Sequence, residues 1–166
     1  KVGIIAGVEA RGKELRKAME EDIREVRDKV SHLSPDERPT VFHLIWHEPL
    51  WTAGGDTFIN EFITIAGGKN AVADLSGYVT LDLEEFIRRN PDIITVVENH
   101  GDAENLPYQF LLSDGRLQVL KAIQEHKVFP VDADIVSRSS TRVVDAIHIF
   151  ARILHPEIFG EYEYEK

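Results

Sequence analysis

Three short apolar runs, separated by segments with helical periodicity, constrain the fold of this chain more than any other feature. Each run has the length and composition of a buried strand, and the three cover residues 40–46 (TVFHLIW), 93–97 (IITVV) and 127–131 (KVFPV). Helices are expected at residues 57–66, from Asp82 to before Asn90, at 116–126 and at 140–154. Strands that alternate with helices form βαβ units, which join into a mostly parallel sheet. The sequence therefore predicts an α/β fold of three layers with a Rossmann-like arrangement.

A long amphipathic helix is expected ahead of this region. Its apolar side chains recur at steps of three or four residues: Leu15, Met19, Ile23, Val26, Val30 and Leu33. This stripe is narrow, so the helix packs on one side only. At ~1.5 Å per residue, residues 10–33 span ~36 Å, enough to reach across a domain or between two. The segment from Ser34 to Pro39 then breaks the pattern.

Composition and charge exclude several classes of function. The chain has 166 residues and a formal net charge of −10. This acidic surplus argues against a nucleic-acid partner and against direct adsorption to anionic lipid. The absence of cysteine removes disulfides, thiolate metal ligands and cysteine nucleophiles. No apolar run approaches the ~18 residues of a membrane-spanning helix, and no signal peptide is visible. The chain starts on KVGIIAGV without a methionine, so we expect a fragment of a longer protein.

The loops that follow the three predicted strands carry the candidate binding residues. In a parallel sheet these loops lie at one edge, where α/β proteins bind ligands. Aromatic faces with a few polar groups are typical of a small-molecule pocket, and here the candidates are Trp46, Trp51, Asn99, His100, Arg138 and Arg142. Gly54 and Gly55 would let the backbone come close in the first loop. Two other interpretations stay open, namely that the tryptophans pack against the first helix and that the arginines form surface ion pairs.

A series of motifs, in matching order and spacing from about Thr40 to Phe159, resembles one protein family. The motifs are WHEPLWTAG at 46–54, AGGKN at 66–70, NPDIITV at 90–96, AIQEHKVFPVD at 122–132 and LHPE at 154–157. They are similar to motifs in the carboxy-terminal lobe of ABC-transporter solute-binding proteins that carry iron-siderophores, haem or cobalamin. The resemblance implies that residues 1–38 are an interlobe helix and linker, and that residues 39–166 are the carboxy-terminal ligand-binding lobe. The amino-terminal lobe would then lie outside this chain.

The resemblance also implies a function and a location. The whole protein would be the extracytoplasmic binding component of an ABC importer, anchored to the membrane, with the permease and its ATPase as partners. It would have no catalytic activity and no resident cofactor. Its ligand would be a metal chelate, and the sequence leaves open whether this is cobalamin, haem or a ferric siderophore.

Individual residues receive roles from the same resemblance. Trp46, Trp51 and Tyr78 would form an aromatic wall suited to a corrin, a porphyrin or a catecholate. Arg138 and Arg142 would face carboxylates or an anionic chelate, although SST at 139–141 replaces the P-G-P of the family, which changes the shape of this loop. Glu84, in the first turn of a helix, would dock on arginines of the permease. We expect Asp82 to cap that helix and Glu85 to complete a capping box, which would leave Glu84 facing solvent.

An enzyme is the alternative to a binding protein. His100, Asp102 and Asp134, all in loops after strands, could act as acid–base groups. His43 and His47 lie too far apart along a strand to share one metal ion unless the loop folds back, so no metal site is predicted. If only half of a ligand cleft is present, its aromatic surface would be exposed, and we expect the fragment to self-associate.

Overall fold

The computed structural model describes residues 9–98, 105–136 and 142–164. Its sheet has the strand order β4-β2-β1-β5-β6, and β3 also pairs with β1. The strands are β1 (Thr40–His47), β2 (Leu50–Ala53), β3 (Lys69–Asn70), β4 (Tyr78–Leu81), β5 (Ile93–Glu98) and β6 (Val128–Asp132). The strands β1, β5 and β6 run parallel, as does β3 with β1, whereas β2 is antiparallel to both β1 and β4. The predicted α/β fold with a mostly parallel sheet is therefore confirmed.

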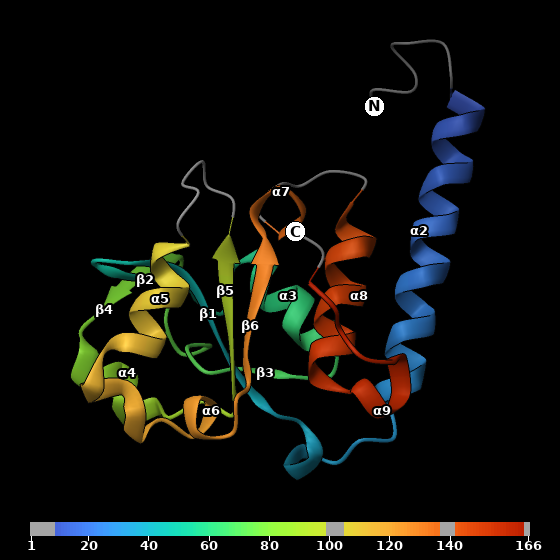
Figure 1. Ribbon diagram of the computed structural model, residues 1–166. Helices are drawn as coiled ribbons and strands as arrows, with labels where there is room; N and C mark the ends of the chain where they lie inside the picture. The colour runs from blue at the N-terminus through green and yellow to red at the C-terminus, as the bar shows by residue number, and fades with distance from the viewer. Residues whose placement is uncertain (1–8, 99–104, 137–141, 165–166) are drawn as a thin grey trace.

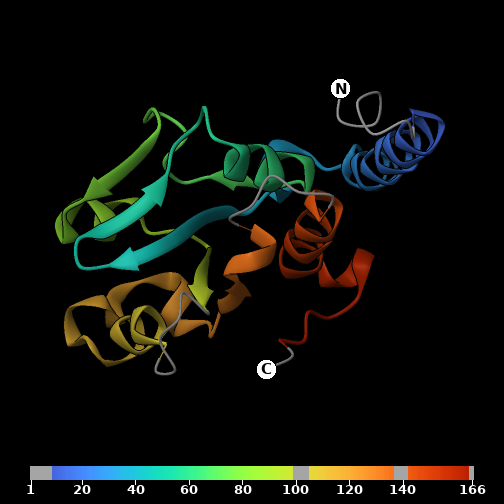
Figure 2. The same ribbon diagram turned by 90° about the horizontal axis from the view of Figure 1, so that it is seen from above.

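Helices cover both faces of this sheet (Figures 1 and 2). One face carries α3 (Phe58–Ile65), α8 (Val143–Leu154) and α9 (Pro156–Phe159), with α2 (Glu9–Val30) outside them. The other face carries α4 (Leu83–Arg89), α5 (Leu106–Ser113), α6 (Lys121–Gln124) and the 3₁₀ turn η2 (Gly115–Val119). The short helix α7 (Ala133–Val136) follows β6, and the 3₁₀ turn η1 (Pro35–Glu37) precedes β1.

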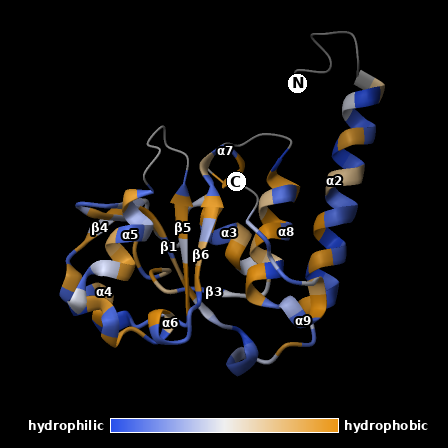
Figure 3. Ribbon diagram, in the orientation of Figure 1, coloured by the Kyte–Doolittle hydropathy of each residue, from blue (hydrophilic) through white to orange (hydrophobic). Residues whose placement is uncertain are grey.

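Alternation along β1 builds a separate core on each face. Val41 and Ile45 pack in the core beneath α3 and α8, whereas Phe42 and Leu44 pack in the core beneath α4 and α5. Successive side chains of a strand point to opposite faces, so an apolar run of this kind is buried on both sides. Figure 3 shows the same contrast, with hydrophobic central strands and many hydrophilic residues along α2.

Two segments depart from the sequence prediction. The segment expected to be a loop after the first strand is instead a β-hairpin, because Leu50–Ala53 pairs with both β1 and β4. The helix expected at 116–126 is interrupted at Leu120, where η2 ends and α6 begins. The structure also adds α5, whose weakly periodic sequence gives no clear helical signal.

The helix α2 packs on α8 and α3 through its carboxy-terminal half only. Val26 and Val30 are buried, while residues 10–18 are all exposed, including Leu15 at 48%. Figure 1 shows the amino-terminal part of α2 extending past the edge at which β1, β5 and β6 end, called here the carboxyl edge. No helix within the described ranges has the length and apolarity needed to cross a membrane.

Candidate functional site

Both tryptophans lie on the hairpin of β1 and β2. The Cα atoms of Trp46 and Trp51 are directly paired, and a register shift lies between Leu44 and Trp46. The turn contains Pro49 after a cis peptide bond. The predicted strand-to-helix loop is thus wrong as local structure, but the hairpin still presents both indole rings near the carboxyl edge.

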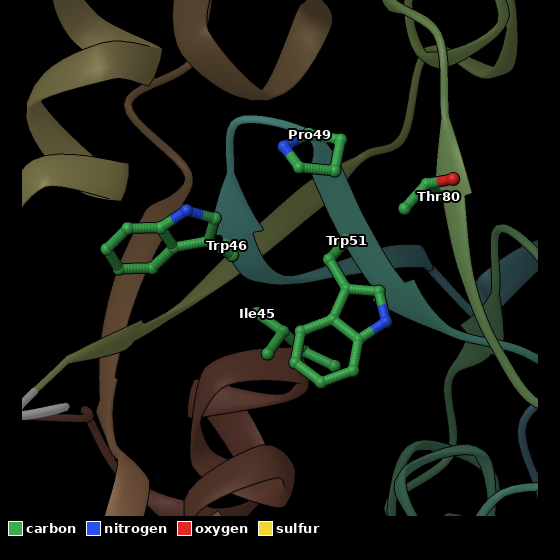
Figure 4. A pocket seen from close by; sticks show the side chains of 5 residues that line it. All are labelled: Ile45, Trp46, Pro49, Trp51 and Thr80. Atoms are coloured by element: carbon green, nitrogen blue, oxygen red, sulfur yellow. The ribbon is translucent and has the colours of Figure 1, made fainter.

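A shallow apolar depression of about 520 Å³, called here the aromatic hollow, lies over this hairpin. Figure 4 shows its lining residues, with the rings of Trp46 and Trp51 on either side of Ile45, Pro49 at the turn and Thr80 on the neighbouring strand. Trp51 remains 41% exposed. Neighbouring aromatic side chains that leave apolar surface free form the kind of patch that can mark a binding site.

A second, smaller cavity of about 200 Å³ lies beside the first and is called here the inner hollow. Its lining residues are His43, Ile45, Trp51, Phe58, Ile59, Tyr78 and Val136, so Ile45 and Trp51 belong to both cavities. The ring of Tyr78 lies 5.9 Å from Trp51 and 6.3 Å from Phe58, between ring centroids. The three aromatic residues predicted to form one wall, Trp46, Trp51 and Tyr78, are therefore brought together, although their role toward a ligand stays a prediction.

The hairpin is held by the segment that precedes β4. The backbone N–H groups of Gly54 and Gly55 donate to the carbonyl oxygens of Gly77 and Leu75, each at 2.8 Å. The Asn70 amide donates to the Ala53 carbonyl at 2.9 Å and accepts from the Val72 N–H at 3.0 Å. The predicted close approach at the glycine pair is thus real, and it is made to the protein's own backbone.

His43 forms the polar part of the inner hollow. It is 1% exposed, and its Nδ1 lies 2.8 Å from the hydroxyl of Thr95, its neighbour across β5. Burial lowers the pKa of His43 to about 3, so the imidazole is neutral at physiological pH. From the sequence, His43 is weighed as a metal ligand and set aside as a structural histidine, and it is not placed in a binding cavity. His43 and Ile45 lie two residues apart on β1, so their side chains point to the same face of the sheet. This spacing is the signal that could have placed His43 in the cavity.

The other predicted polar residues are only partly described. Asn99, His100, Asp102 and Arg138 lie outside the described residues. Arg142 is exposed at the start of α8, and Asp134 is exposed on α7, where its N–H donates to Asp132 Oδ1 at 2.7 Å. The described residues contain no group of three or more His, Asp and Glu side chains that could hold a metal ion.

Glu84 occupies the position that the sequence predicts. It is exposed in the first turn of α4, and Asp82 caps this helix by accepting from the Glu85 N–H at 2.7 Å. The predicted capping box is wrong, because the Glu85 carboxylate binds Arg88 and Arg89 instead of turning back to residue 82.

Comparisons with known proteins agree with this architecture. The sequence profile of the family described as "Periplasmic binding protein" matches residues 1–135. The uncharacterized ABC transporter substrate-binding lipoprotein YvrC of Bacillus subtilis (strain 168) is 31% identical over 161 residues, which are 96% of this chain and 49% of that protein. A cobalamin-binding protein of Halobacterium salinarum (strain ATCC 29341 / DSM 671 / R1) is 25% identical over 140 residues, covering 79% of this chain and 37% of that protein.

A solved structure shares the fold. A possible iron-binding (periplasmic solute-binding) protein from Staphylococcus epidermidis ATCC 12228 superposes with a TM-score of 0.78 at 24% identity, over 93% of this chain and 58% of the other. The match spans 49% of the length of the Bacillus relative and 37% of that of the Halobacterium relative.

The family is periplasmic and the Bacillus relative is a lipoprotein, so the expected extracytoplasmic location is confirmed. The profile match over residues 1–135 and the 31% identity to a substrate-binding lipoprotein both support the resemblance seen in the motifs. The chain belongs to the family described as periplasmic binding proteins.

Proposed function

We propose that this chain is one lobe of a solute-binding protein that captures a metal chelate of the ferric-siderophore, haem or cobalamin type. The observation that carries the proposal is the aromatic hollow, where Trp46 and Trp51 present apolar ring surface beside a half-exposed Tyr78. Its volume of about 520 Å³ lies within the range of ~300–1,000 Å³ that small-molecule sites occupy. Flat ring systems gain from burial and stacking on such a surface.

The names of related proteins support this ligand class. One relative is a cobalamin-binding protein, and a structural neighbour is described as possibly iron-binding. These names belong to other proteins at 25% identity or less, so they support the class of ligand without choosing within it. Asn99, His100, Arg138 and Arg142 are proposed to contribute polar contacts to the same ligand.

The other wall of the site is proposed to come from a second lobe. The chain covers 49% of the Bacillus relative. In addition, α2 extends beyond the carboxyl edge with its residues 10–18 exposed. A second lobe at the far end of α2 would face the aromatic hollow and enclose the ligand between the lobes. The protein would act by binding and release, without catalysis and without a resident cofactor.

Delivery of the ligand is proposed to require an ABC permease and its ATPase. Glu84 would form an ion pair with a permease arginine, since it is exposed in the first turn of α4, at the position to which the motif resemblance assigns this role. Stabilisation by the helix dipole is the alternative reason for an acidic residue at this position. The protein would reach the membrane through this contact and through a lipid anchor like that implied by the name of the Bacillus relative.

Calorimetric titration of the full-length protein tests the ligand class. Cyanocobalamin, haemin and a ferric catecholate siderophore serve as probes, with wild type, Trp51→Ala and, as a control, Leu112→Ala, which removes a similarly exposed apolar side chain on α5. We expect one chelate to bind wild type and to lose roughly tenfold or more in affinity in Trp51→Ala, with little change in melting temperature. Equal affinity in wild type, Trp46→Ala and Trp51→Ala would contradict the proposed site.

A further inference from the structure

We infer that the inner hollow is a subsite for a primary amide arm of the bound chelate, with His43 as the residue that hydrogen-bonds the arm. This inference rests on the proposed function and narrows its ligand class. It would select a chelate whose ring carries uncharged amide arms over one whose ring carries carboxylate arms.

The first argument is the position and anchoring of His43. Its Nδ1 is engaged by the Thr95 hydroxyl, and Phe150 packs near the imidazole at 5.9 Å between ring centroids. The ring is therefore fixed. No described residue hydrogen-bonds Nε2, while His43 lines the inner hollow at 1% exposure. The buried side-chain atoms without a partner in the described chain are His47 Nδ1 and Asn105 Oδ1, so Nε2 of His43 is not sealed off and stays accessible to a ligand group from the inner hollow.

The second argument is charge. The lining residues of the inner hollow, all in the described part of the chain, include no Asp, Glu, Lys or Arg. Burial keeps His43 neutral, so the imidazole brings no positive charge. A carboxylate moved from water into this apolar space would lose its hydration without gaining a counter-ion, whereas an uncharged amide would lose far less.

The third argument is hydrogen-bond complementarity. The Thr95 hydroxyl can donate to Nδ1 or accept from it, so Nε2 is a donor in one tautomer and an acceptor in the other. A primary amide carries both N–H donors and a carbonyl acceptor. It therefore matches His43 in either tautomer, which an ester, an ether or a bare alkyl arm cannot do.

The fourth argument is size and connection. The inner hollow, at about 200 Å³, is smaller than the ~300 Å³ at the lower end of complete ligand sites, so it suits part of a ligand. It shares Ile45 and Trp51 with the aromatic hollow of about 520 Å³. A flat chelate lying against Trp46 and Trp51 would thus have a side arm within reach of the smaller cavity.

The test compares ligands that differ in one arm. Calorimetric titration of the full-length protein uses cyanocobalamin and its three monocarboxylic acids, in each of which a single side-chain amide is hydrolysed to a carboxylate. The metal and the ring are unchanged within this set. We expect wild type to bind at least one monocarboxylic acid roughly tenfold or more weakly than cyanocobalamin.

Two variants and one control test whether the inner hollow causes the difference in affinity between cyanocobalamin and its monocarboxylic acids. His43→Leu removes the hydrogen bond, and Val136→Phe fills the inner hollow while leaving His43 in place. We expect the first to reduce the discrimination to about threefold or less, and the second to weaken binding of cyanocobalamin itself. His155→Leu removes another buried histidine, which lines a different cavity and contacts the Gly67 carbonyl, and it should keep the wild-type discrimination. Val136→Phe keeps the test decisive if His43→Leu does not fold.

The outcomes separate this inference from the proposed function. Equal binding of cyanocobalamin and all three monocarboxylic acids by wild type would overturn the inference, as would full discrimination in His43→Leu or unchanged binding in Val136→Phe. If haemin or a ferric siderophore binds wild type and cyanocobalamin does not, the inference is wrong while the proposed function stands. If none of the three chelates binds, both are wrong.

Discussion

Gly54 and Gly55 show how single residues fix the geometry of the aromatic hairpin. Their N–H groups donate hydrogen bonds to backbone carbonyls of the segment before β4. The backbones lie so close together that neither glycine has room for a side chain. A Cβ atom on Gly54 would overlap the carbonyl group of Leu75, and one on Gly55 would overlap that of Ala73. Neither glycine has a positive φ, so close packing rather than backbone conformation explains why glycine is needed.

Gly54→Ala is therefore expected to destabilise the protein by about 2 kcal/mol or more, because the backbone of β2 must move away from Leu75. Gly115→Ala is the control, since no atom lies within 4 Å of the place that its Cβ would occupy and its φ is not positive. Urea denaturation followed by circular dichroism measures both. Similar midpoints for the two variants would contradict the packing argument.

Residues in separate sequence motifs also contact each other directly. The ring of His155, in LHPE, lies with Nε2 3.3 Å from the carbonyl oxygen of Gly67, in AGGKN. Asn70 of the same motif bonds Ala53 at the end of the tryptophan motif. Much of the motif pattern by which the family resemblance is recognised thus reflects packing within the lobe, which is why motif residues alone do not identify a ligand.

At the scale of elements, α4 is fixed to the lobe by Arg89. This side chain is 12% exposed, and its guanidinium donates to Asp74 through both Nη atoms, to Glu85 and to the Ala71 carbonyl. Hydrogen bonding to Arg89 lowers the pKa of Asp74 to about 2. Bidentate pairs of this kind fix orientation as well as distance. The helix that carries Glu84 is therefore held at one angle to the sheet.

Arg89→Met should lower the free energy of unfolding by about 1–3 kcal/mol, because the part-buried Ala71 carbonyl and the Asp74 carboxylate lose their donor, whereas Glu85 keeps its bonds to Arg88. Arg88→Met is the matched control on the same helix. The Arg88 side chain is 71% exposed and hydrogen-bonds Glu85, so its loss should change stability much less than the loss of Arg89. Chemical denaturation of both variants tests the difference, and equal effects would show that Arg89 does not anchor α4.

The proposed docking of Glu84 is testable on the same element. Glu84→Gln in the full-length protein should leave chelate affinity unchanged and reduce uptake into proteoliposomes that contain the cognate permease and ATPase. Glu61→Gln provides a control, since Glu61 is likewise exposed in the first turn of a helix, α3. Uptake that is equally reduced in both variants would point to general charge loss, and unaffected uptake in Glu84→Gln would remove the docking role.

How far the sequence predicts each element depends on where its stabilising contacts lie. The strands β1 and β5 are predictable because their apolar runs are buried on both faces, and β6 because it contributes Val128 to one core and Val131 to the other, which leaves a local signal. The strands β2 and β4 have four residues each and exist through pairing between distant segments, such as Thr52 with Val79. No local pattern reports such pairing, so a hairpin containing Pro49 looks like a loop in the sequence. His43 escapes prediction as a cavity residue for the same reason, since Phe58, Tyr78 and Val136 come from three other elements.

At the scale of the whole molecule, two of the exposed apolar sites lie where a second lobe is proposed. One is the aromatic hollow with Trp51 and the adjacent Tyr78, which is 45% exposed, and the other is Leu15 on the projecting part of α2. In the proposed two-lobed protein, the second lobe would face both. Surfaces of this kind tend to drive association when they are left uncovered.

We therefore expect the 166-residue chain to self-associate at tens of micromolar and the full-length protein to remain monomeric, as measured by sedimentation velocity. Replacing Trp51 and Tyr78 by serine should weaken association of the short chain, because it removes aromatic area that a second copy would cover. Leu112→Ser is the control, being 47% exposed on α5, the helix that packs on the opposite face of the sheet. If the 166-residue chain stays monomeric across this range, exposure of the aromatic hollow to solvent does not drive association. Association that persists in the serine variant would instead locate the contact on α2, where Leu15→Ser becomes the decisive substitution.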